Sequence, residues 1–321
     1  MDPMDQLPSQ PGWERELVTK LALANVREQA AKRRWSIFFK LLWIALVVLI
    51  VAWFNGWIGH GLSSNESVGR HTALVKLDGE IADSGKASAE NINAALAAAF
   101  KDTDSVAVIL NINSPGGSPV QSARIYSEIK RLRKDNPEKP LYVVVDELCA
   151  SGGYYVAAAA DKIYVDPSSL VGSIGVIYQG FGADKAIEKL GIENRTVTAG
   201  ENKAFMDPFA PMKPEHKAHL EAMLADVHQQ FIKAVKEGRG SRLKETTPGL
   251  FSGLIWSGNK AIDIGLVDGT GSVGSVARDV VKAEDLVDYT VEENTFDKLA
   301  RRIGASFGAG VIQAVNKSSW K

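Results

Sequence analysis

The chain has 321 residues, 45% of them hydrophobic, and a formal net charge of −1 at pH 7. This length allows a large core in one or two domains, and the balanced charge argues against a protein that binds nucleic acid through a basic face. The single cysteine, Cys149, excludes an intramolecular disulfide, and we expect it to be a small buried hydrophobe at the end of a strand.

The N-terminal part predicts attachment to a membrane. Residues 1–34 form a charged tail, and residues 35–58 are mostly apolar and long enough as one transmembrane helix to cross a bilayer. Trp35 and Trp57 suit the two membrane interfaces. Basic residues precede this window and are scarce after it, so the positive-inside rule places the tail in the cytoplasm and the rest of the chain outside.

A cleaved signal peptide is the alternative explanation of the apolar window. The long tail before the window and the lack of an Ala-x-Ala-like site after it count against cleavage. Residues 59–71 are rich in glycine, serine and asparagine, and we predict that they form a linker between the membrane and the following domain.

Strand-like and helix-like segments alternate through the main domain, residues 72–282. Strands are predicted over 73–81, 106–112, 141–145, 162–165 and 196–198. Helices are predicted over 89–101 with Ser88 as the cap, 119–134, 154–160, 184–190 and 214–239. This alternation predicts an α/β fold in which helices cover a mostly parallel sheet.

Two further segments complete this prediction. The helix over 214–239 is expected to pack on the outside of the domain through an apolar stripe of helical period, formed by Leu220, Met223, Leu224, Val227, Phe231 and Val235. Residues 283–321 form a C-terminal extension that is strand-like over 286–291 and helix-like over 296–315. The sequence does not define the role of this extension.

A serine and two glycine turns are the candidate functional residues. The segment Ala150-Ser-Gly-Gly-Tyr-Tyr155 follows an apolar strand and opens a small-residue helix, which exposes the Ser151 hydroxyl at a helix N-terminus. A second turn, Asn113-Ser-Pro-Gly-Gly117, also follows a strand and would supply an oxyanion hole. Either segment alone is typical of an ordinary turn. Together they indicate an acyl-transfer site with Ser151 as its nucleophile.

No histidine is well placed to activate this serine. Two of the five histidines lie near the apolar window, and His216, His219 and His228 lie on the predicted helix over 214–239. His216 and His219 stand among charged residues and are expected to be solvated. Their i, i+3 spacing without further ligands also argues against a zinc site, so we predict no metal.

A lysine is the remaining type of base, since Ser–Lys pairs are an established variant of the catalytic triad. Lys203 follows a predicted strand and a turn at Gly200, beside Phe205 and Met206. A free lysine titrates near about 10.4, so a lysine base needs burial beside apolar side chains to be neutral near pH 7. A lysine at this spacing is usually a surface residue, so spacing alone does not select Lys203.

Seven short motifs, in one order over residues 72–275, resemble the bacterial signal peptide peptidase A family. They are Asn113-Ser-Pro-Gly-Gly117, Ala150-Ser-Gly-Gly-Tyr-Tyr155, Ala159-Ala-Asp-Lys-Ile163, Val171-Gly-Ser-Ile-Gly-Val176, Gly200-Glu-Asn-Lys203, Gly238-Arg-Gly240, and Trp256-Ser-Gly258 leading to Ala261-Ile-Asp-Ile-Gly-Leu-Val-Asp268. The resemblance implies the fold of the Clp protease and crotonase superfamily. It makes residues 72–282 a Ser–Lys protease domain that needs no cofactor.

The same resemblance implies a role for each matching residue. Ser151 would be the nucleophile, Lys203 the general base, and Ser173 a hydroxyl that orients the lysine amine. The backbone N–H groups of Gly152 and of Gly116 or Gly117 would form the oxyanion hole, and the sequence leaves open which of the last two donates.

The implied function is that of a membrane-anchored serine endopeptidase. It would degrade remnant signal peptides or other short hydrophobic peptides at the outer face of the bacterial inner membrane. Small members of the family are expected to assemble into ring-like homo-oligomers in which the lysine of one subunit completes the serine of its neighbour. The alternatives are a crotonase-like acyl-CoA enzyme, which needs no nucleophilic serine, and a non-catalytic scaffold, which would be expected to lose Ser151 or Lys203.

Overall fold

The computed structural model describes residues 32–50 and 69–291. Residues 32–50 form a helix that does not belong to the compact unit holding the sheet, which runs from Ser67 to Glu293. The predicted transmembrane segment, residues 35–58, falls partly on this helix, and residues 51–58 lie outside the described ranges. Within those ranges, no helix combines the length and apolar character needed to span a bilayer. Most of the predicted tail and linker, and the helix-like stretch 296–315, also fall outside.

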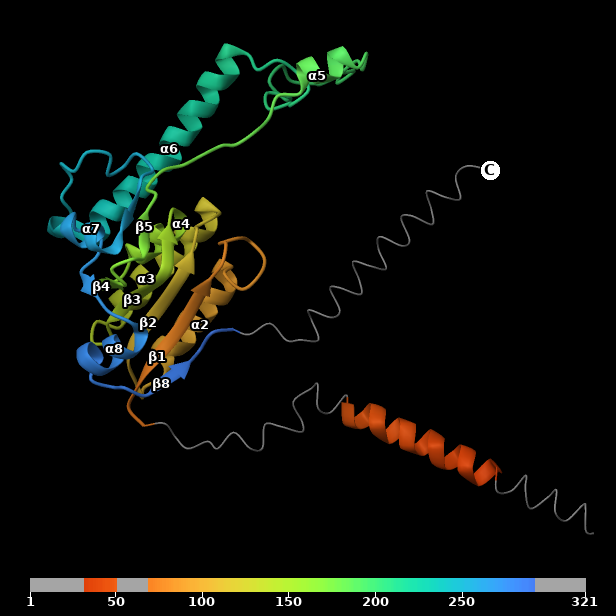
Figure 1. Cartoon of the computed structure of the whole chain (residues 1–321), viewed down its shortest axis with the longest axis vertical. Helices are drawn as coiled ribbons and strands as arrows, with labels where there is room; N and C mark the ends of the chain where they lie inside the picture. Colours follow the sequence, from red (N-terminus) through yellow and green to blue (C-terminus); the bar gives the residue numbers. More distant parts are fainter. Residues whose placement is uncertain (1–31, 51–68, 292–321) are drawn as a thin grey trace, which may run out of the picture. The chain divides into compact units, whose positions relative to one another are not determined.

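A mostly parallel sheet forms the centre of the Ser67–Glu293 unit (Figure 1). Its strands are β1 (His71–Asp78), β2 (Ser105–Ser114), β3 (Leu141–Ala150), β4 (Lys162–Val165), β5 (Leu170–Gly172), β6 (Ile255–Ser257), β7 (Gly269–Thr270) and β8 (Leu286–Asp288). The order is β6-β5-β3-β2-β1-β8, and β4 pairs with β3 and β7. Only the β5–β6 pair is antiparallel among these strands. The predicted α/β class with a mostly parallel sheet is therefore confirmed.

The central strands are buried on both faces of the sheet. Val75, Leu110 and Val143 belong to the main core on one face. Leu74 precedes Val75 in the sequence, and Val144 follows Val143. Both belong to a smaller core on the other face, because successive side chains of a strand point to opposite faces. Near-continuous Val, Ile and Leu runs are what parallel strands covered on both sides need.

Helices cover the sheet and begin where the sequence signals them. They are α2 (Ala89–Lys101), α3 (Pro119–Asp135), α4 (Gly152–Ala157), α5 (Asp184–Lys189), α6 (Pro214–Arg239), α7 (Gly258–Asp263) and α8 (Val273–Ser275), with the short helices η1 (Gly240–Arg242) and η2 (Val276–Val281). Ser88 caps α2 by accepting a hydrogen bond from the Asn91 N–H at 3.3 Å, an interaction typically worth about 1 kcal/mol. The predicted starts of α2, α3, α5 and α6 are therefore confirmed, whereas α4 begins two residues before its predicted start and α7 and α8 were not predicted.

Two predictions are corrected here. Residues 196–198 form no strand, because no neighbouring strand offers them hydrogen bonds. Of the apolar stripe of α6, only Phe231 and Val235, in the C-terminal half, are fully buried, whereas Met223 in the other half is 48% exposed. Figure 1 shows the N-terminal half of α6 extending beyond the sheet, with α5 and its loops at the tip.

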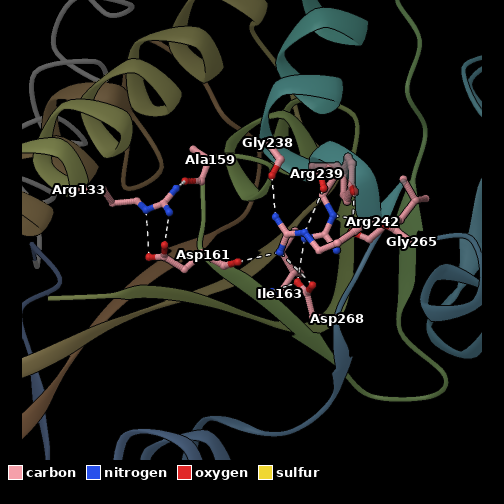
Figure 2. Close-up of polar contacts among 11 residues, drawn as sticks. Arg133, Ala159, Asp161, Ile163, Gly238, Arg239, Arg242, Gly265 and Asp268 are labelled. Carbon is pink, nitrogen blue, oxygen red and sulfur yellow. Dashed lines mark hydrogen bonds and ion pairs between the residues drawn. The ribbon is translucent and has the colours of Figure 1, made fainter. Parts of the chain in front are cut away.

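A buried ion network fixes the C-terminal half of α6 to the sheet (Figure 2). Arg239 is 1% exposed, and its guanidinium donates to Gly265 O at 2.9 Å and to Asp268 Oδ2 at 2.8 Å. Asp268 also accepts hydrogen bonds from the Ile163 N–H and from Arg242. The network thus joins α6, β4 and the segment before β7 through one carboxylate.

A second ion pair and a glycine contact extend this connection. Asp161 accepts from Arg133 on α3 and from the Leu141 N–H at the start of β3. A Cβ at Gly238 would lie 1.9 Å from Ala158 O, so only glycine lets α6 approach α4 this closely. The motifs at residues 159–163, 238–240 and 261–268 therefore meet in this network, which supports the fold and contains none of the proposed catalytic residues.

Acid is expected to destabilise the domain through two of its carboxylates. Burial alone would raise the pKa of Asp268, but the hydrogen bond and charge of Arg239 outweigh it and hold that pKa below its usual range. Hydrogen bonds from Tyr289 and from the Asp104 N–H lower the pKa of Asp102 in the same way. A depressed carboxyl pKa stabilises the folded state above the unfolded value of about 3.9, and this contribution is lost as the pH falls through the folded-state value.

Urea unfolding of the full chain between about pH 7 and about pH 3 measures this dependence. We expect the free energy of unfolding to fall below about pH 4, and to fall less steeply in an Asp102→Asn variant. A domain that gains stability on acidification through this range would contradict the assignment.

Candidate active site

Ser151 stands at a strained turn between β3 and α4. Its φ of 50° and ψ of −122° lie in a region that L-residues rarely adopt, at a cost of about 1–3 kcal/mol. The turn is held in place because the Ser151 N–H donates to Gly172 O at 2.9 Å. Among the described non-glycine residues, a positive φ occurs only at Ser151, Ser173 and Lys282. Such a strand-to-helix elbow is the geometry that presents a nucleophilic hydroxyl.

The glycine turn after β2 packs directly against this elbow. Gly116 and Gly117 have φ values of 97° and 143°, which favour glycine. A Cβ at Gly116 would lie 2.5 Å from Gly152 N, and one at Gly117 would lie 2.2 Å from Ile81 O. Side chains are therefore excluded at both positions, and the two turns predicted from sequence are neighbours in space.

Two backbone N–H groups beside Ser151, those of Gly117 and Gly152, lack acceptors among residues 69–291. The Gly116 N–H is already bonded to Ser114 Oγ at 3.1 Å. The Gly117 N–H has no acceptor within residues 69–291, and Gly152, as the first residue of α4, has none inside its helix. A Cβ at Gly152 would lie 3.2 Å from Gly117 N, so the two groups adjoin. Of the two glycines left open by the sequence, Gly117 is the one whose N–H remains available.

A cavity of about 120 Å³ opens beside Ser151. Its remaining lining is largely apolar and comes from the turn after β2, from α3, α4 and α6, and from the segment after β5: Gly117, Pro119, Ser122, Gly152, Tyr155, Gly175, Val176, Ile177, Val227 and Phe231. Tyr155 and Phe231 stack with their ring centroids 5.0 Å apart and form one wall. A largely apolar cavity of this size suits an apolar side chain.

Ser173 lies in the turn that follows β5. Its φ is 52°, and its N–H donates to Leu254 O at 2.8 Å. Its neighbour Gly172 accepts the hydrogen bond from the Ser151 N–H, so the two serine turns are directly linked through the backbone. The Ser173 hydroxyl makes no hydrogen bond within the described part of the chain and is free to bind a further group.

Lys203 is not brought to Ser151 within the single chain. It is an exposed residue in a series of turns over 201–206, and it does not line the cavity beside Ser151. The segment that carries it, between β5 and α6, lies with α5 at the N-terminal end of α6 (Figure 1). Its amine makes no hydrogen bond or ion pair with any other described residue. The strand predicted before Lys203 is absent, and this exposed setting replaces the partly buried one that we expected.

Sequence reasoning missed the residues that support the two serine turns. His228 donates from Nε2 to Ile174 O at 3.1 Å and so ties the Ser173 turn to α6. The sequence signal for this contact was that His228 directly follows Val227, a member of the apolar stripe that faces the domain. His216 bonds Asn202 Oδ1 at 3.0 Å at the other end of the helix, away from Ser151. Within the described ranges, no cluster of three or more His, Cys, Asp or Glu side chains is arranged to hold a metal.

The chain is similar in sequence to known proteases. The family model described as Peptidase family S49 matches residues 133–287. A protein of Methanocaldococcus jannaschii that is described as a protease is 35% identical over 217 residues, which cover 66% of this chain and 68% of the relative. Protease 4 of Haemophilus influenzae is 32% identical over 242 residues, 71% of this chain and 38% of the relative.

A third relative has a different name. The Na(+)/H(+) antiporter NhaA of Brucella abortus is 43% identical over 210 residues, 64% of this chain. The chain spans only 28% of the length of that protein. The antiporter name therefore describes a much longer protein, and it carries no argument about the site beside Ser151.

Proposed function

Because the chain belongs to peptidase family S49, we propose that it is a membrane-anchored serine endopeptidase with a Ser–Lys dyad. One observation carries the proposal. Ser151 occupies a strained elbow and lines a largely apolar cavity, beside the N–H groups of Gly117 and Gly152, which have no acceptor among the described residues. A nucleophile, two oxyanion donors and a side-chain pocket are the parts that acyl transfer needs in one place.

Each residue then has a defined step. Ser151 Oγ attacks the peptide carbonyl carbon while a neutral Lys203 amine takes its proton. The Gly117 and Gly152 N–H groups stabilise the oxyanion that forms. The protonated lysine next gives its proton to the leaving amine, and a water molecule hydrolyses the acyl-enzyme by the reverse assignment. We propose that Ser173 orients the lysine amine through its hydroxyl, which makes no hydrogen bond among the described residues.

The substrates that fit are short hydrophobic peptides, among them the remnants of cleaved signal peptides. The cavity beside Ser151 is walled by Tyr155, Val227 and Phe231, which favour an aliphatic side chain over a charged one. We place the chain in the bacterial inner membrane through residues 35–58, with its N-terminus in the cytoplasm and the protease domain on the outer face. This orientation rests on the distribution of basic residues around the apolar window.

The dyad is proposed to form between subunits of a ring-like homo-oligomer. Ser151 lines a cavity without a lysine, whereas Lys203 is exposed on a segment that also exposes large hydrophobic side chains, including Phe181 at 83% and Val197 at 94%. Exposed apolar side chains in this number suit an interface between copies of the chain. A head-to-tail ring would bring the lysine of each subunit to the serine of the next.

Mixing two inactive variants tests the shared dyad. The wild-type full chain is expected to cleave short apolar peptides, with products identified by mass spectrometry. Ser151→Ala and Lys203→Ala are each expected to be inactive alone. Under subunit exchange in equal amounts, about a quarter of the interfaces pair an intact serine with an intact lysine, so about a quarter of the activity should return.

Exchange must be verified independently, for example by energy transfer between labelled subunits. Inactivity of a verified mixture would show that each dyad is built within one chain. A wild-type chain that cleaves no peptide would instead reject the peptidase assignment.

A further inference from the structure

We infer that Ser114 is a positioning residue: by anchoring the peptide before Gly116, it helps to hold the turn in which the Gly117 N–H points toward the oxyanion. This inference rests on the proposed function, because it concerns the N–H group of Gly117 that would stabilise the oxyanion. Ser114 is the last residue of β2 and is completely buried. It takes no part in the steps assigned to Ser151, Lys203 and Ser173.

The Ser114 hydroxyl makes two hydrogen bonds that connect different segments. It donates to Gly79 O at 2.6 Å, in the loop after β1, and accepts from the Gly116 N–H at 3.1 Å. A hydroxyl can donate and accept at once, so one side chain satisfies both groups. The Gly116 N–H is thereby fixed toward Ser114 and away from the reacting carbonyl.

The loop after β1 fixes the other side of Gly116. The Ile81 N–H donates to Gly116 O at 2.7 Å. In a trans peptide the C=O and N–H groups point in opposite directions, so the Gly117 N–H must point away from Ile81. That direction leads to Gly152, since a Cβ on Gly152 would lie 3.2 Å from Gly117 N.

Gly116 is therefore held at both of its peptide groups. At its φ of 97° glycine has wide conformational freedom, so without anchors the backbone dihedrals of this turn would change readily. Ser114 anchors the peptide before Gly116 and Ile81 anchors the peptide after it. Only the Ser114 anchor is a side chain, so it is the part of this arrangement that a substitution can remove.

The test is Ser114→Ala in the full chain, read by kinetics and by amide hydrogen exchange. We expect kcat for an apolar peptide to fall by about tenfold to a hundredfold, less than or comparable to the loss of one oxyanion donor, with KM changed by less than about twofold. Binding of a peptide aldehyde, whose oxygen becomes the oxyanion when Ser151 Oγ adds to it, should weaken by the same factor as kcat/KM. The Gly116 amide should lose its protection from exchange.

Two further variants keep the test specific. Ser114→Cys retains a weaker donor and acceptor of similar size, so we expect activity between those of wild type and Ser114→Ala. Ser105→Ala removes a buried hydroxyl at the opposite end of the same strand, where it bonds Ala107 O, and should leave kcat unchanged.

Loss of Gly116 protection with unchanged kcat would overturn the inference, as would full protection of Gly116 in Ser114→Ala. An inactive wild-type chain would reject the proposed function, while the exchange of Gly116 would still decide whether Ser114 holds the turn.

Discussion

Ser151→Ala and Lys203→Ala are each expected to lower kcat for peptide hydrolysis by about a million-fold, the scale on which serine proteases respond to loss of the nucleophile or its base. The two groups act as one unit, so the double variant should be no slower than either single one. Alanine has no hydroxyl to attack the carbonyl, and an unassisted Ser151 is a weak nucleophile at neutral pH. The measurement is kcat for a peptide whose cleavage products are identified by mass spectrometry.

A matched lysine variant separates the general base from mere loss of charge. Lys189 lies on α5, in the same exposed segment as Lys203, and Lys189→Ala should retain wild-type turnover. Thermal unfolding should be unchanged in both lysine variants, because both side chains are exposed. Substantial turnover in Lys203→Ala would leave Ser151 with a different base and reject the dyad.

Much of the fold was predictable because its signals are local. Helix α6 begins at Pro214 and ends at Arg239 as expected, since a proline suits the first turn of a helix and Gly240 follows the last. Strand β4 coincides with its short apolar run, Lys162–Val165. By contrast, β5 and β6 were not predicted, because each has only three residues and exists through its pairing with a distant segment.

In the candidate site, too, the parts with local sequence signals were predictable and the contacts between distant segments were not. The elbow at Ser151 and the turn at Gly117 were readable from glycines placed directly after apolar strands. The contact between Ser114 and Gly79 was not readable, because it joins residues 35 positions apart through one hydroxyl. The strand predicted before Lys203 is absent because a β-branched run such as Thr196-Val-Thr198 becomes a strand only where a partner strand is present.

The second large effect is expected on stability, from Asp268→Asn. This change removes the charge that balances Arg239, which is 1% exposed and has one guanidinium nitrogen, Nη2, already without a partner among the described residues. A buried charge left uncompensated typically costs about 3–5 kcal/mol of the free energy of unfolding. Urea unfolding of the full chain measures this loss as a lower midpoint with an unchanged slope.

A control on the same helix tests whether burial is the cause. Lys236 and Glu245 form an ion pair at 2.6 Å, with side chains 43% and 49% exposed, so Glu245→Gln should cost less than about 1 kcal/mol. Arg239→Met combined with Asp268→Asn removes both charges and should recover part of the loss, because no buried charge then lacks a partner. A double variant no more stable than Asp268→Asn would contradict an uncompensated buried charge as the cause of the loss. Recovery of stability would mean that the ion pair mainly fixes where α6 packs, and through α6 the positions of Val227 and Phe231 in the wall of the Ser151 cavity.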